Sequence, residues 1–105
     1  MIFVVEMPAG AEPSAWFAYD EEDLLRKLAA AGSLDDWQAH GSSTLRELLE
    51  AALRSRGECC IYWTEAEATA AFERSADPAW QGKGWRARWA LREQLIALEV
   101  LSDDL

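Results

Sequence analysis

The chain has 105 residues, of which 50% are hydrophobic and 28% are charged, a balance typical of a soluble globular domain. We therefore expect one domain over residues 1–105. The net charge of −9 opposes binding to nucleic acid or to an anionic membrane and favours basic or neutral partners. No apolar run approaches the ~20 residues that span a bilayer. The apolar run 1–5 has no basic flank and ends at Glu6, so we expect a buried strand, no signal peptide and a cytoplasmic protein.

The first two predicted elements are strands over residues 1–7 and 14–19, which are rich in β-branched and aromatic residues. The segment between them contains Pro8, Gly10 and Pro13, which suit a turn, so the two runs predict an antiparallel hairpin. Both faces of each run are largely apolar. This pattern predicts a sheet that is covered on both sides or lies at the centre of its domain.

Two helices are predicted next. Asp20 is a good N-cap for a helix over 21–31 that ends at Gly32, and a weaker cap pattern at 33–36 predicts a short helical turn. Thr44 and Glu47 form a capping-box pattern for the clearest helix of the chain, which ends near Gly57. Its apolar stripe follows helical spacing and consists of Leu45, Leu48, Leu49, Ala52 and Leu53.

The last three elements are a strand over 59–63, a helix over about 65–74 and a helix from about 85 towards 100. A second capping box at Thr64 and Glu67 starts the first of these helices, with Ala68, Ala71 and Phe72 as its inner stripe, and Asp77 and Pro78 end it. We expect residues 102–105 to fray. The order β-β-α-α-β-α-α predicts an α+β fold, a small two-layer or mixed domain with a three-stranded sheet and about four helices. The long crossover before the third strand would allow parallel pairing with the second, and the strand order stays open.

The segment 80–92 reverses the acidic character of the chain, since it holds four cations, no acidic residue and three of the six tryptophans. An aromatic, basic segment that opens a helix predicts a contact surface. The candidate partner-binding residues are Trp80, Lys83, Trp85, Arg86, Arg88, Trp89 and Arg92.

The last predicted helix is apolar on two sides. One side groups Trp85, Trp89, Ile96 and Val100, and the other groups Ala87, Leu91, Leu95 and Leu98. A helix of this kind buries both faces within its own domain, or buries one face against a partner or a second copy of the chain, as in a homodimer. Both alternatives remain open at this stage.

Parts of the sequence are also compatible with three other kinds of site. The arginines of segment 80–92, with the glycines beside Lys83, suggest an anion or small-molecule site, although the remainder of a phosphate-binding loop is missing. The acidic run 20–23 is explained by helix capping, and no zinc-ligand spacing occurs, so we expect no metal and no cofactor. A thiol enzyme would combine Cys59 or Cys60 with His40, whereas buried, reduced thiols in a strand explain the cysteines more simply.

The sequence contains no catalytic or cofactor motif. We therefore expect a non-catalytic, acidic cytoplasmic protein that acts through protein–protein contacts, in the class of inhibitors, immunity proteins and antitoxin-like adaptors. The alternatives are a small-molecule or anion-binding protein or enzyme that uses segment 80–92, and the thiol enzyme.

Overall fold

The computed structural model describes residues 1–30, 44–74 and 84–101. The strands are β1 (Ile2–Glu6), β2 (Ser14–Ala18) and β3 (Cys59–Tyr62), and the helices are α1 (Glu21–Ala30), α2 (Leu45–Arg54), α3 (Glu65–Glu73) and α4 (Gly84–Ala97). The predicted α+β fold and the order β-β-α-α-β-α-α are confirmed.

The sheet is antiparallel throughout, with β1 at its centre and the order β2-β1-β3. β1 pairs with β2 in the predicted hairpin, with Phe3 opposite Phe17, and it pairs with β3 with Phe3 opposite Tyr62. The second and third strands therefore run in the same direction but are not neighbours. The parallel pairing that the crossover would have allowed does not form, because β1 lies between them.

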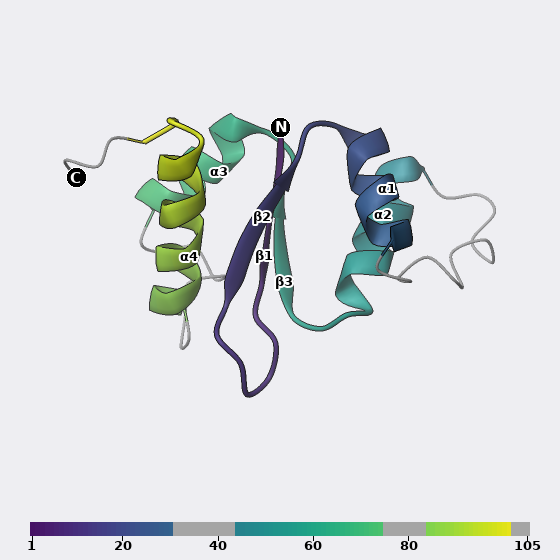
Figure 1. Ribbon diagram of the computed structural model, residues 1–105, viewed down its shortest axis with the longest axis horizontal. Coiled ribbons are helices and arrows are strands. Elements are labelled where there is room, and N and C mark those ends of the chain that lie inside the picture. Colours follow the sequence, from purple (N-terminus) through teal and green to yellow (C-terminus); the bar gives the residue numbers. More distant parts are fainter. Residues whose placement is uncertain (31–43, 75–83, 102–105) are drawn as a thin grey trace.

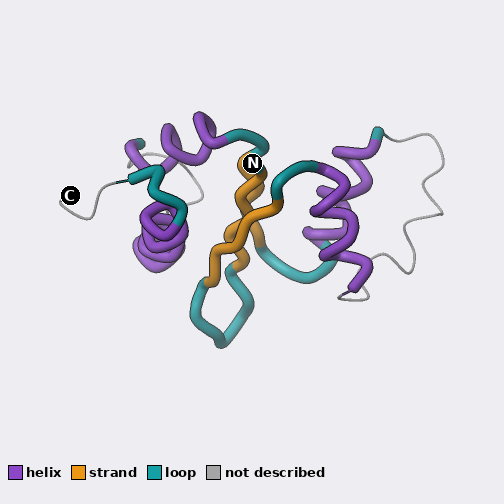
Figure 2. The backbone as a smooth tube through the Cα atoms, turned by 45° about the horizontal axis from the view of Figure 1, so that its top comes forward, coloured by secondary structure: helices purple, strands orange, loops and turns teal. Residues whose placement is uncertain are grey.

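Helices cover both faces of the sheet (Figures 1 and 2), with α1 and α2 on one face and α3 and α4 on the other. Successive residues of a strand point to opposite faces, so the continuous apolar run of β1 serves both layers. Ile2 and Val4 pack towards α1 and α2, whereas Phe3 and Val5 pack towards α3 and α4. The prediction of a sheet covered on both sides is confirmed.

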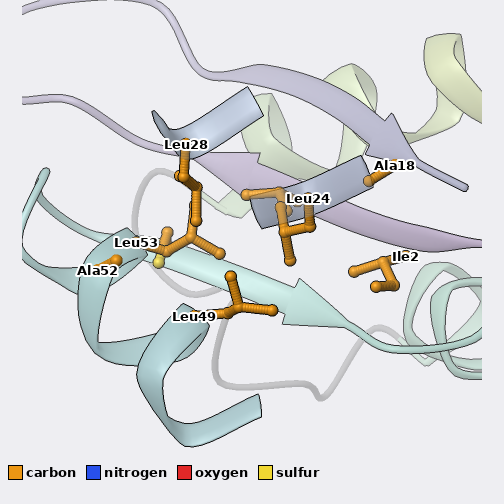
Figure 3. Close-up of a cluster of buried hydrophobic side chains, with 9 residues drawn as sticks. Ile2, Ala18, Leu24, Leu28, Leu49, Ala52 and Leu53 are labelled. Atoms are coloured by element: carbon orange, nitrogen blue, oxygen red, sulfur yellow. The ribbon is translucent and has the colours of Figure 1, made fainter. Parts of the chain in front are cut away.

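Each face of the sheet has its own apolar core. The first core (Figure 3) consists of Ile2, Val4, Ala18, Leu24, Leu28, Leu49, Ala52, Leu53 and Cys59. The second consists of Phe3, Val5, Met7, Tyr62, Ala68, Ala71, Ala87, Leu91 and Leu95. The second core holds α4 against the sheet, and this contact fixes which side of α4 faces outward.

The same capping arrangement joins a strand to the helix that follows it at two places. Asp20 accepts from the N–H of Asp23 at 2.8 Å, and the Asp23 carboxylate accepts from the N–H of Tyr19 at 3.0 Å. Thr64 accepts from the N–H of Glu67, whose carboxylate accepts from the N–H of Trp63 at 2.8 Å. The predicted N-caps are confirmed, including Thr44 in α2. These bonds satisfy donors that a helix start leaves exposed.

α4 ends earlier than predicted, at Ala97 rather than near residue 100. Glu99 takes a left-handed φ of 61°, and the N–H groups of Glu99 and Val100 donate to the carbonyls of Ile96 and Leu95. This is a Schellman ending, in which the chain reverses and its next apolar residue returns to the helix. Val100 consequently packs on the second core, and its predicted grouping with Trp85 and Trp89 on one side of the helix was wrong.

The predicted turn at 33–36, the helix ends at Gly32 and at 77–78, and the frayed segment 102–105 lie outside the described residues. Among the residues described, no helix has the length and apolar character needed to cross a membrane.

Candidate functional site

α4 presents two large aromatic side chains to solvent. Its inner side is buried, with Ala87, Leu91 and Leu95 in the second core. On the outer side, Trp85 is 68% exposed and Trp89 is 56% exposed. The alternative in which both faces of this helix are buried within its own domain is therefore wrong for these two tryptophans. α4 forms an outer layer on the sheet, and such a helix buries only one side.

Two arginines extend this tryptophan surface. The Arg86 guanidinium lies 5.1 Å from the centre of the Trp85 ring, and the Arg92 guanidinium lies 5.0 Å from the centre of the Trp89 ring. Stacking of this kind holds a guanidinium in place while its edge can still donate hydrogen bonds. We call Trp85, Arg86, Trp89 and Arg92 the α4 surface.

Of the other three predicted site residues, only Arg88 lies within the described ranges, and it does not belong to this surface. Arg88 points towards α3, where its guanidinium lies 4.8 Å from the centre of the Phe72 ring. Trp80 and Lys83 fall outside the ranges that the structure describes. Four of the seven predicted residues are therefore brought together, and Arg88 is placed apart from them.

The turn between β1 and β2 borders the α4 surface, and sequence reasoning missed this. Glu12 forms an ion pair with Arg86 at 3.2 Å. Glu12, Pro13 and Glu93 line a shallow depression of about 270 Å³ together with Trp85, Arg86, Trp89 and Ala90. The sequence could have predicted the position of Glu93, because it follows Trp89 by four residues and therefore lies on the same face of the helix. No local sequence pattern predicts that the turn contacts α4, because this contact depends on the packing of the helix on the sheet.

The arginines of α4 do not converge on one point that could hold an anion. Arg86 is paired with Glu12, Arg88 stacks on α3, and Arg92 stacks on Trp89. The Glu93 carboxylate also lines the depression, and it would repel an anion there. The described residues therefore give no support to an anion site, and Lys83, which the predicted site also includes, lies outside them.

The two cysteines point to opposite faces of the sheet. Cys59 belongs to the first core and is 7% exposed, whereas Cys60 is half-buried against the second core. Burial raises the pKa of the Cys59 thiol, which disfavours the reactive thiolate. Both residues carry thiols. The burial prediction is confirmed for Cys59 and is wrong for Cys60. His40 lies outside the described residues, so the thiol-enzyme site has no described geometry.

The acidic run at 20–23 acts in capping, as the hydrogen bonds of Asp20 and Asp23 show. The pKa of Asp23 is lowered, first by the hydrogen bond from the Tyr19 N–H and further by Lys27. Within the described ranges, no three histidine, cysteine or acidic side chains are grouped as metal ligands.

A second depression, of about 180 Å³, also lies near the turn end of the hairpin, beside Glu6, Ser14 and Arg56. Glu6 and Arg56, which line this depression, form an ion pair with each other at 3.1 Å, so neither charge needs a ligand to compensate it. We therefore place the candidate site at the α4 surface.

Comparison of the chain with family models, with curated proteins and with solved structures found no match.

Proposed function

We propose that this chain is a non-catalytic protein that acts by binding another protein chain through the α4 surface. The observation that carries the proposal is the exposure of Trp85 and Trp89, one helical turn apart, on a helix whose opposite side is held in the core. Tryptophan and arginine are the residues that most often dominate the binding energy of protein interfaces. A pair of exposed tryptophans costs solubility unless a partner covers it.

The surface is also organised before any partner binds. The second core fixes the backbone of α4, and Trp85 and Trp89 hold the guanidinium groups of Arg86 and Arg92 by stacking. Side chains that are already ordered lose less conformational entropy on binding. This arrangement supports a contact surface of the kind used by inhibitors, immunity proteins and antitoxin-like adaptors. A cytoplasmic location is part of the proposal and is supported by the two thiols, which persist in a reducing compartment.

Site-specific photo-crosslinking in the native cell tests the proposal. A photoreactive residue replaces Ala97, which is exposed at the end of α4, and in a control it replaces Ala29, which is exposed on α1 in the opposite layer. We expect a discrete protein adduct from position 97 and none from position 29. The adduct is expected to disappear when Trp85 and Trp89 are changed to serine in a chain that still folds.

An adduct that persists in the folded serine variant would contradict the proposal, as would equal adducts from both positions. If no protein adduct forms and native mass spectrometry instead shows a small molecule that is lost from the serine variant, the small-molecule alternative is correct. Tyr19→Ser is the matched control, because Tyr19 is as exposed as Trp85 but lies at the end of β2.

A further inference from the structure

The charges of α4 are arranged differently from those of the other described helices. α1, α2 and α3 each carry acidic side chains in the first turn, where they complement the positive end of the helix dipole. α4 has no acidic residue in its first turn, where Arg86 lies, and, like α3, it has no basic residue in its last turn. Its dipole is therefore left without the usual compensating charges.

Arg86 and Glu93 lie on the same flank of α4. They are seven positions apart in the sequence, so they are about 20° apart around the helix and about 10.5 Å apart along it. This separation is too long for an ion pair within one helix. Trp89 lies almost halfway between them along the helix, next to the depression that Glu93 lines.

From these two observations we propose that the α4 surface binds a second copy of the same chain, with the two α4 helices antiparallel across a two-fold axis beside Trp89. This inference rests on the proposed function, of which it names the partner. Such an axis is perpendicular to both helices. It places the flank of α4 that carries Arg86 and Glu93 next to the same flank of the other copy, with the helix direction reversed. It therefore places Arg86 of each copy opposite Glu93 of the other and forms the same ion pair twice.

The antiparallel arrangement also compensates the helix dipole. It brings the negative C-terminal end of one α4 beside the N-terminal turn of the other, where Arg86 lies. The two copies of Trp89 meet at the axis and lose the exposure that they have in the single chain. Arg92 lies on the opposite flank and stacks on Trp89, at the rim of the contact, where solvent screens its charge.

The net charge of −9 on each copy acts against association, but its range is limited. At physiological ionic strength charges more than about 8 Å apart are largely screened. Close pairs across the interface are much less affected, so the local Arg86–Glu93 complementarity decides the geometry.

The test measures the mass of the full chain in solution by sedimentation equilibrium, for the wild type and a charge-exchange series. We expect a wild-type dimer, and folded monomers with a cooperative thermal transition from Trp89→Ser. Arg86→Glu alone and Glu93→Arg alone are each expected to weaken the dimer by about tenfold or more, because each puts like charges in contact. The double variant is expected to restore it, since the exchanged charges again attract.

Two controls separate this effect from others. Arg46→Glu reverses the charge of an exposed, ion-paired arginine on α2 in the opposite layer and is expected to leave the dimer intact, which separates a general charge effect from loss of the Glu93 contact. Tyr19→Ser removes an exposed aromatic group, comparable to Trp89, from a different surface. It is likewise expected to leave the dimer intact.

Several results would overturn the inference: a wild-type monomer at every concentration, a dimer unaffected by folded Trp89→Ser, or a double variant as weak as the single variants. A monomer that still gives a crosslink from position 97 to a different protein would refute self-association and leave the proposed function standing. A monomer with no such crosslink would refute both.

Discussion

The indole Nε1 of Trp16 donates a hydrogen bond of 3.0 Å to the Glu6 carboxylate on the neighbouring strand. The same carboxylate forms an ion pair of 3.1 Å with Arg56, which follows α2. Glu6 thus connects both strands of the hairpin to the segment that leads into β3. Its side chain is only 17% exposed, so these contacts are partly shielded from water.

Glu6→Ala is expected to lower the free energy of unfolding by about 1–2 kcal/mol, because hydrogen bonds to charged groups contribute ~1.5–3 kcal/mol each and part of this is recovered by solvation. Urea unfolding measures the change. Glu12→Ala is the matched control from the same hairpin, where the ion pair with Arg86 is exposed and is expected to contribute ~0–1 kcal/mol. Equal losses in the two variants would show that Glu6 does not connect these segments.

Leu49→Asp is expected to unfold the domain or to destabilise it severely. Leu49 has no exposed surface in the first core, and an unpaired buried carboxylate costs several kcal/mol, on the order of total domain stability. Leu45 lies one turn earlier on α2 and is 41% exposed, so Leu45→Asp is expected to change stability by less than about 1 kcal/mol. Circular dichroism and thermal melting compare the two. If both variants melt like the wild type, α2 does not pack on the first core through Leu49.

Glu99→Gly is expected to stabilise the protein by about 1 kcal/mol, because glycine adopts the left-handed conformation at this helix end without the strain that a side chain adds. Introducing glycine at an exposed position in the middle of α2, by Ala51→Gly, is expected to lower the free energy of unfolding by ~1 kcal/mol. Opposite signs in urea unfolding would confirm the Schellman ending of α4. Destabilisation by Glu99→Gly would contradict it.

Native Cys59 is expected to react slowly with iodoacetamide, and Cys60 faster, as measured by mass spectrometry of the labelled peptides. Cys59 is buried, and burial raises its pKa from the usual value of 9.0, so less thiolate is present at a given pH. Cys60 is half-buried. Unfolding in urea is expected to make the two rates similar. Rapid labelling of Cys59 in the native state would show that its environment is open.

The raised pKa of Cys59 also predicts a pH dependence of stability. The folded state binds this thiol proton more tightly than the unfolded state, so its contribution is fully present below the unfolded-state pKa and is lost as the pH rises through the folded-state pKa. The wild type is therefore expected to lose stability above about pH 9, and Cys59→Ala to lose less over the same range. Parallel pH profiles of the two proteins would contradict the prediction.

Local sequence determined most of the secondary structure of this chain. Helix starts depend on contacts within four residues, and Thr44, Thr64 and Asp20 make the predicted caps. The two-sided apolar pattern of residues 2–5 similarly predicted a sheet covered on both faces, because strand geometry alone alternates the side chains. The exception is the end of α4, where Glu99 takes a conformation that a side chain disfavours. Packing of Val100 on the second core accompanies that turn.

The tertiary structure alone decided what the α4 surface contains. By spacing, both sides of this helix are equally apolar, and only its packing on β1 and β2 buries Leu91 and leaves Trp89 exposed. The strand order and the approach of Glu12 to Arg86 likewise depend on contacts between segments far apart in the chain. The sequence by itself determined which segments form helices and strands, because those preferences are local. Which faces remain exposed followed only from competition among all apolar faces for a limited interior, and that competition involves the whole chain.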